Sequence, residues 1–226
     1  LHVFLLGGFA AFVVVLAVTG RDTSGYPLAE LPLHILLMQN WGFTADLTWN
    51  HPAWSISTEF AAYLAFPLIV AAARWERLPA PALLALAAGL AAALAALFAW
   101  AGAENLGDRI AQLGLWRCLT AFCLGNIACI LWQRWKDARG AAGLAALVCA
   151  GLVGAGLAFD LHEAAFVPAA FFAGILALAL DQGRAGAVLC KRPFIYLGEI
   201  SYSTYLVHFF LFILFKIAFV DDTLQL

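Results

Sequence analysis

One carboxylate, Glu59, stands in an apolar stretch long enough to cross a membrane. An ionised side chain at membrane depth costs roughly 2.5 to 3.5 kcal/mol on insertion scales, so it is expected to face a polar cavity or partner. Ser55, Glu59 and Tyr63 follow one another at i, i+4 spacing and therefore share one helix face. Glu59 can act there as a base, a proton carrier or an orienter of a histidine. The alternative is a structural carboxylate bonded to a tryptophan or tyrosine.

A second polar stripe occurs near the end of the sequence. Ser201, Tyr205 and His208 recur at helical spacing and place a hydroxyl, a phenol and an imidazole along one face. Such groups can assist an attacking hydroxyl as a base and can donate hydrogen bonds to a developing oxyanion. A histidine that only packs is the alternative. We expect the two stripes to face a common polar cleft, because polar groups in lipid associate with one another.

Both stripes belong to recognisable stretches. The first reads Trp54-Ser55-Ile56-Ser57-Thr58-Glu59 and continues to Tyr63 and Pro67, and the second reads Leu197-Gly198-Glu199-Ile200-Ser201-Tyr202-Ser203-Thr204-Tyr205-Leu206-Val207-His208. In this order they resemble two signatures of the acyltransferase 3 family, integral membrane enzymes that acylate carbohydrates and other cell-envelope acceptors. The resemblance covers nearly the whole chain.

The resemblance implies an O-acyltransferase of the bacterial inner membrane. It would move an acyl group, commonly acetyl, from a cytoplasmic acyl-CoA to a hydroxyl of a glycan or lipid-linked sugar. Acetyl-CoA or another acyl-CoA is expected as the donor substrate, and no bound cofactor is expected. Glu59 and His208 are the expected catalytic residues. The expected cavity-lining residues are His51, Trp54, Ser55, Tyr63, Arg117, Ser201, Tyr202 and Tyr205.

Two of these residues have a plainer interpretation. Arg117 could bind an anionic group of donor or acceptor through its guanidinium, or it could extend to the membrane interface. His51 precedes the helix-starting Pro52 and could be an interfacial cap. The sequence contains no cluster of residues at metal-ligand spacing, so no metal site is expected. A haem held between His34 and His208 has no support beyond the two histidines.

The sequence departs from the family pattern at one important point. The family carries an arginine and a histidine ten residues apart on its first span, where acyl transfer is thought to be centred, and no arginine here is followed by a histidine at that spacing. Arg74 and Arg77 match the letters of another family motif but follow the Trp-Ser stretch instead of preceding it. We therefore expect the chain to lack the family's first two spans and to be inactive alone.

Composition agrees with a membrane protein. The chain is 65% hydrophobic and 12% charged, with a mean hydropathy of +0.92, whereas soluble domains are about 25% charged. A net charge of −2 and the lack of a basic patch argue against nucleic-acid binding. The five cysteines include no C-x-x-C pair and are expected to be small apolar filler.

Hydrophobic runs predict an all-α, polytopic transmembrane helix bundle that forms a single domain over residues 1–226. About 20 apolar residues cross the bilayer, which predicts seven spans: 1–19, 54–73, 80–100, 112–132, 141–159, 164–181 and 194–220. Segment 31–38 is too short and is expected to be interfacial or re-entrant.

Basic loops alternate with acidic ones along these spans. By the positive-inside rule the basic loops are cytoplasmic: Arg74 and Arg77; Arg134, Lys136 and Arg139; Arg184, Lys191 and Arg192. The other loops are then external: Asp46; Glu104, Asp108 and Arg109; Asp160, His162 and Glu163; Asp221 and Asp222. His51 falls near the outer face.

Two rival functions remain open. A proton-coupled transporter or flippase would use Glu59 and His208 as proton-relay groups. It would be favoured by two matching halves with helices broken by glycine or proline, which the sequence does not show. A subunit that only packs against partners is the other rival.

Overall fold

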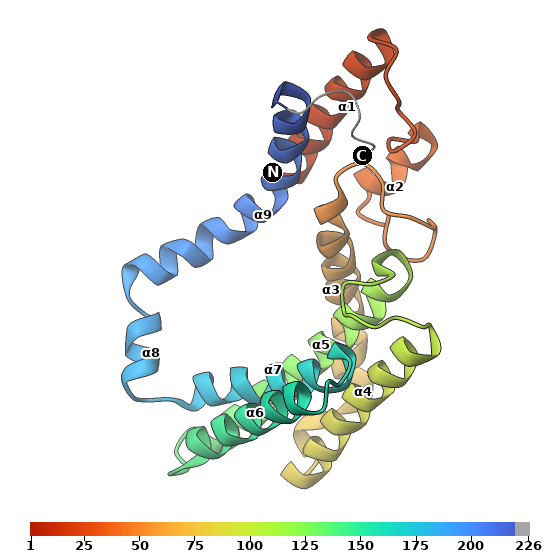
Figure 1. Cartoon of the computed structure of the whole chain (residues 1–226). Helices are drawn as coiled ribbons and strands as arrows, with labels where there is room; N and C mark the ends of the chain where they lie inside the picture. Colours follow the sequence, from red (N-terminus) through yellow and green to blue (C-terminus); the bar gives the residue numbers. More distant parts are fainter. Residues whose placement is uncertain (220–226) are drawn as a thin grey trace. The chain divides into compact units, whose positions relative to one another are not determined.

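The computed structural model describes residues 1–219, and within that range all regular secondary structure is helical (Figure 1). The long helices are α1 (His2–Val18), α3 (Trp54–Ala73), α4 (Ala80–Trp100), α5 (Ile110–Trp135), α6 (Ala141–Ala158), α7 (Glu163–Leu180) and α9 (Arg192–Phe219). Shorter elements are η1 (Leu28–Glu30), α2 (Leu31–Ile35), η2 (His51–Ala53), η3 (Trp75–Arg77) and α8 (Arg184–Leu189). The helical fold class predicted from the sequence is confirmed. Asp221 and Asp222 lie outside the described residues.

The predicted spans agree with the helices to within a few residues. Six helices of the described part are long and apolar enough to cross a membrane, and α1 falls just short at 17 residues. About seven spans is consistent with this set, since the shortest helices that cross a bilayer have roughly 17 residues. Segment 31–38 forms only the five-residue helix α2. The chain therefore has a multi-pass membrane architecture.

The chain divides into two compact units. The first contains residues 1–61 and the C-terminal helix α9, and the second contains residues 62–191. Helix α3 contributes its first turns to the first unit and the rest to the second. Each unit is described by itself below, and the single domain expected over residues 1–226 stays a prediction.

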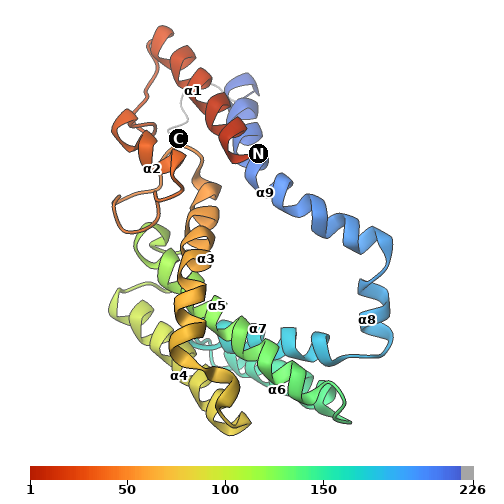
Figure 2. The same cartoon turned by 180° about the vertical axis from the view of Figure 1, so that it is seen from behind.

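The first unit is built on aromatic packing between its two ends. Helix α1 and the C-terminal half of α9 lie side by side in both views (Figures 1 and 2). Phe9 is completely buried and meets Phe210 with ring centroids 4.9 Å apart in an edge-to-face arrangement. The core also contains Leu6, Phe12, Leu16, Tyr26, Trp49 and Ile213. These contacts bring the last helix of the chain onto the first.

Trp49 fixes the irregular segment that precedes α3. Its side chain is 1% exposed, and its indole Nε1–H donates to the carbonyl oxygen of Pro27 at 3.1 Å. Its backbone N–H donates to the carbonyl oxygen of Gly25 at 3.0 Å. Trp49 has φ of 56°, a left-handed conformation that is strained for a bulky residue and needs support from its surroundings. The conformation sets where Asn50 and His51 lie.

The second unit has two apolar clusters at opposite ends of the same helices. One joins the start of α4 to the ends of α5 and α7, through Leu83, Leu131 and Leu180 among others. The other joins the end of α4 to the starts of α5 and α7, through Phe98, Leu113 and Ala164 among others. Helix α4 therefore runs antiparallel to α5 and α7. This alternation is what consecutive membrane spans require.

Helix α6 packs mainly on α7. Their contact is by far the most extensive between any two helices of the described part. Gly156 allows it, because a Cβ at that position would stand 2.6 Å from the ring of Phe166. Small residues permit such close approach between helices in lipid. The opposite side of α6 is exposed, with Leu144, Leu147 and Leu157 uncovered.

Candidate functional site

The Trp-Ser stretch begins in a well-packed helix start. Pro52 sits in the first turn, in η2, where the missing N–H of proline is no loss. Ser57 is completely buried, and its Oγ accepts a hydrogen bond from the backbone N–H of Asn40 at 3.1 Å. The indole Nε1–H of Trp41 donates to the carbonyl oxygen of Ser57 at 2.9 Å. The first turns of α3 are thus docked on segment 39–41.

The two signature stretches meet in the first unit. Asn50 Nδ2 donates to the carbonyl oxygen of Leu206 at 3.3 Å in a buried contact. The His51 ring stacks on Phe209, with centroids 4.7 Å apart and planes at 21°. Further along, the Glu59 carboxylate lies near enough to the phenol of Tyr202 to act on it electrostatically.

The order of these contacts fixes the direction of the two segments. Asn50 bonds to position 206 and His51 stacks on position 209, while the Glu59 carboxylate has an electrostatic effect on Tyr202. The chain from η2 into α3 therefore runs antiparallel to α9, as alternating spans predict. The structure thus places Glu59 and Tyr202, two of the expected site residues, in the same part of the first unit.

The packed face of α9 differs from the polar stripe expected from the sequence. Leu206 and Ile213 are buried at 0% and 1% exposure, and Tyr202 and Phe209 lie on the same side at helical spacing. Ser201, Tyr205 and His208 lie one position earlier and are exposed, and Tyr202 is exposed as well. Ser201 Oγ–H donates to the carbonyl oxygen of Gly198 in its own helix at 2.7 Å.

His208 has a defined tautomer. Its Nδ1 is bonded to the carbonyl oxygen of Tyr205, and because a carbonyl can only accept, Nδ1 carries the proton. In the neutral ring Nε2 then keeps its lone pair and can accept a proton. The Tyr205 ring lies 5.7 Å from the His208 ring.

Other predicted residues near Glu59 have local partners. Ser55 Oγ–H donates to the carbonyl oxygen of Pro52 at 3.0 Å, and Thr58 Oγ1–H donates to that of Ser55 at 2.9 Å. Glu59 itself is partly buried. These bonds hold the serine and threonine to the helix backbone, so Glu59 is the side chain on this face that can carry a charge.

Tyr63 and Arg117 belong to the second unit. The Tyr63 ring is exposed and packs edge-on against Phe122, with centroids 6.1 Å apart. The guanidinium of Arg117 donates to the carbonyl oxygen of Leu106 in the loop before α5. That bond ties Arg117 to the end of its own helix bundle, which agrees with the interfacial alternative considered for it.

The structure also contains a partly buried hydrogen-bond network around His34 that the sequence did not reveal. Thr48 Oγ1–H donates to the Glu30 carboxylate at 2.6 Å, and His34 Nε2 lies 3.0 Å from Thr48 Oγ1. The threonine has one proton and gives it to Glu30, so His34 Nε2–H must donate to Thr48. His34 Nδ1 is left without a proton. It is buried and has no hydrogen-bond partner.

Burial keeps His34 neutral. Desolvation lowers the pKa of its imidazole to about 4, with further lowering by His2 and His51. The ring is 1% exposed. At neutral pH, His34 therefore presents an uncharged acceptor nitrogen with a fixed orientation.

Like His34 Nδ1, two amide oxygens near it are buried without a hydrogen-bond partner. Gln39 Nε2 donates to the carbonyl oxygen of Ala53 at 3.0 Å, and Asn50 Nδ2 is used by Leu206. Gln39 Oε1 and Asn50 Oδ1 are buried without a partner. Leaving such an acceptor unpaired costs about 1–3 kcal/mol, so each is suited to a hydrogen-bond donor.

These residues line a small cavity. It measures about 10 Å³, close to the smallest space that holds one water molecule. His34, Gln39 and Asn50 line it, together with the predicted residues His51 and Trp54. The lining presents acceptors and suits a single O–H group. The sequence signal for this site is the set of polar residues in and after the short apolar segment 31–38.

Among residues 1–219, no three histidine, cysteine, aspartate or glutamate side chains are placed to hold a metal ion. The cysteines of the described chain are unpaired thiols. The site is therefore described by its hydrogen bonds and by the charge on Glu59.

A protein-family model described as an acyltransferase domain matches residues 1–225 of the chain. No curated protein and no solved structure matches it. The matched region includes both polar stretches, 54–67 and 197–208, and both compact units.

Proposed function

The chain belongs to the acyltransferase 3 family, and on that premise we propose that it takes part in O-acyl transfer from an acyl-CoA, acetyl-CoA in the first instance, to a hydroxyl of an envelope carbohydrate. The membrane acyltransferase class follows from the family and from the apolar helices. The donor, the acceptor and the bacterial inner membrane as its location are parts of the proposal.

One observation carries the proposal. The two signature stretches are far apart in sequence, yet Asn50 and His51, just before the first stretch, contact α9 through a hydrogen bond and a ring stack. A carboxylate at membrane depth, such as Glu59, is costly and is expected to face a polar cavity or partner. Sites of acid–base chemistry bring such groups together.

The reaction has three steps that the protein must assist. The acceptor hydroxyl oxygen attacks the thioester carbonyl carbon, its proton passes to a base, and the C–S bond breaks to release a thiolate that takes up a proton. In the proposal, His208 Nε2 is a candidate to receive the hydroxyl proton. Glu59, on the other signature stretch, lines the path of the acyl group.

The small cavity supports an acyl acceptor that carries a hydroxyl group. His34 Nδ1, Gln39 Oε1 and Asn50 Oδ1 are buried acceptor atoms beside His51 and Trp54. A sugar hydroxyl that donates to one of them would be held by its hydrogen bond and would be distinguished from groups that cannot donate. Basic loops on the predicted cytoplasmic side suit the phosphates of the donor.

The experiment is an acyl-transfer assay with the protein expressed from its complete reading frame. Membranes receive acetyl-CoA labelled in the acetyl group and either de-O-acetylated envelope polysaccharide or a lipid-linked sugar fraction. We expect label in the glycan that mild alkali removes, since that treatment cleaves esters. Membranes without the protein provide the background. Folded protein that neither releases coenzyme A nor labels any glycan would contradict acyl transfer from acyl-CoA.

A further inference from the structure

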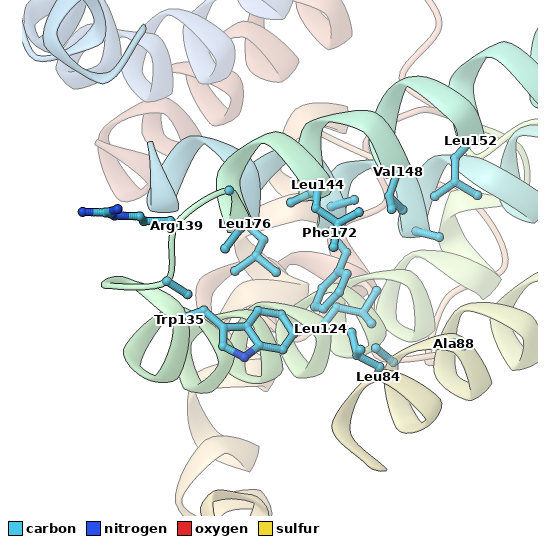
Figure 3. A pocket seen from close by; sticks show the side chains of 17 residues that line it. Leu84, Ala88, Leu124, Trp135, Arg139, Leu144, Val148, Leu152, Phe172 and Leu176 are labelled. Carbon is cyan, nitrogen blue, oxygen red and sulfur yellow. The ribbon is translucent and has the colours of Figure 1, made fainter. Parts of the chain in front are cut away.

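The second unit contains a long apolar groove. It has a volume of about 560 Å³. Helix α7 forms its floor through Phe172 and Leu176, while α4 and α5 form one wall and α6 forms the other (Figure 3). The side chains along it are almost all aliphatic or aromatic.

The groove exists because α6 is held from one side. Its extensive contact is with α7, and α4 packs on α5 and α7 instead. Alanines at positions 87, 88, 145, 169 and 173 line the groove and leave space where larger side chains would close it. In a bilayer this space cannot hold water, because its walls offer no hydrogen bonds. An apolar occupant is required.

One end of the groove is basic. Arg139 belongs to the lining, and Figure 3 shows its side chain extending away from the apolar residues at that end. The turn 134–139 contains Arg134, Lys136 and Arg139 against the single acid Asp137. Arg134 is already used, because it donates to the carbonyl oxygens of Leu78 and Glu76 at 2.7 Å each. Arg139 is exposed and makes no hydrogen bond or ion pair within the described residues.

Two further residues, Trp135 and Asp181, lie near this end. Trp135 also lines the groove there, and tryptophan is typical of the membrane interface. Asp181 is occupied by the backbone N–H groups of Gly183 and Gly186 at 3.0 and 2.8 Å. The end with Arg139 is also the end predicted to be cytoplasmic, where anionic lipids and basic side chains meet.

The lining of the groove suits a hydrocarbon chain. Small and branched apolar side chains from α4, α6 and α7 line it, and Arg139 lies at one end. A lipid acyl chain with an anionic headgroup matches both features, because it offers an apolar length and a negative charge at its end.

We propose that this groove binds one acyl chain of an anionic phospholipid, with the lipid phosphate at the guanidinium of Arg139. Arginine presents a planar fork of donors that matches two phosphate oxygens. The chain would lie along α7, between α4 and α6, with its headgroup at the predicted cytoplasmic side. This inference is independent of the acyl-transfer proposal.

The test is native mass spectrometry of the purified protein, after detergent micelles are doped with equal amounts of phosphatidylglycerol and phosphatidylcholine of the same chain length. We expect one retained phosphatidylglycerol, at least about fivefold more abundant than phosphatidylcholine. Arg139→Ala should abolish this preference. Arg77→Ala, which removes an exposed arginine on the same predicted side but outside the groove, should leave it unchanged.

A second pair of variants tests the chain site. Ala145→Phe fills the groove and should reduce retention of both lipids at least about fivefold, whereas Ala146→Phe, at the next position on α6 but outside the lining, should not. Equal retention of both lipids in the wild type, or an unchanged preference in Arg139→Ala, would overturn the phosphate site. A folded protein that retains lipid equally well in Ala145→Phe, or a mass showing two copies of the chain and no lipid, would overturn the groove as the lipid site.

Discussion

Replacing Glu59 with glutamine is expected to lower acyl transfer at least about tenfold, while the amount of folded protein in the membrane stays the same. A positioned group in proton transfer contributes roughly 10²- to 10⁴-fold, and tenfold is therefore a cautious minimum. Glutamine keeps the size and hydrogen-bonding ability of the side chain and removes its charge. The loss would thus report on the carboxylate and not on packing. Label transferred from acetyl-CoA per unit of folded protein is the measurement.

Glu104→Gln is the matched control. Glu104 is an exposed carboxylate in the loop after α4, and the same substitution there should change activity less than twofold. If Glu59 only packs, its substitution with glutamine should leave acyl transfer unchanged. If Glu59→Gln transfers acyl groups at the wild-type rate and Glu59→Ala only lowers expression, Glu59 is a packing residue and the site must be sought elsewhere.

Acidification is expected to destabilise the folded protein through His34. The imidazole has a pKa of about 4 in the folded chain, because burial disfavours its charged form, and about 6.5 when the chain is unfolded. The unfolded state therefore binds more protons between these values, and the free energy of unfolding falls as the pH drops from 6.5 towards 4. Once the pH is below both values the loss is roughly 3 kcal/mol, and between pH 7.5 and pH 5 it is about 2 kcal/mol. Thermal unfolding in detergent at these two pH values measures the loss.

His34→Gln isolates this contribution from that of the carboxylates. A glutamine amide N–H can still donate to Thr48 but cannot titrate. The variant should lose less stability than the wild type between pH 7.5 and pH 5. His34→Asn is a second non-titrating variant if the first does not fold. If the wild type and a folded variant lose the same stability between pH 7.5 and pH 5, protonation of His34 does not contribute to the acid destabilisation.

The sequence predicts the spans well because their signal is local. Runs of apolar residues near 20 long bounded by Gly102, Gly140 or a proline leave little freedom, and the helices begin and end within a few residues of the expected positions. The signature stretch around Glu59 is also local, since Ser55 and Glu59 share a face through helical spacing alone. The bond from Asn50 to Leu206 brings the segment before α3 onto α9, while a common cleft for the two polar stripes stays a prediction.

The orientation of α9 could not be predicted in the same way. An isolated helix does not reveal which face it buries when apolar residues surround it. The polar stripe of Ser201, Tyr205 and His208 suggested one face, but the aromatic core around Phe9 and Phe210 and the bond from Asn50 fix another. That choice depends on α1 and on the segment before α3, which are remote in sequence.

The His34 network was missed for a related reason. Glu30, His34 and Thr48 are separated by irregular chain that has no period, and their hydrogen bonds depend on the left-handed turn at Trp49. The apolar groove likewise follows from how α6 packs on α7. No local pattern in the Ala/Leu-rich helices indicates a space between them.

The central claim is that the two signature stretches form one acyl-transfer site, and a double-mutant cycle on Glu59 and Tyr202 tests it most directly. Acyl transfer is measured for the wild type, Glu59→Gln, Tyr202→Phe and the double variant, at equal amounts of folded protein. Two groups that act as a unit give strongly non-additive losses. The account predicts that the double variant is no more than about threefold less active than Glu59→Gln alone. Two substantial single losses that multiply in the double variant would show that the residues act independently, and would contradict a shared site.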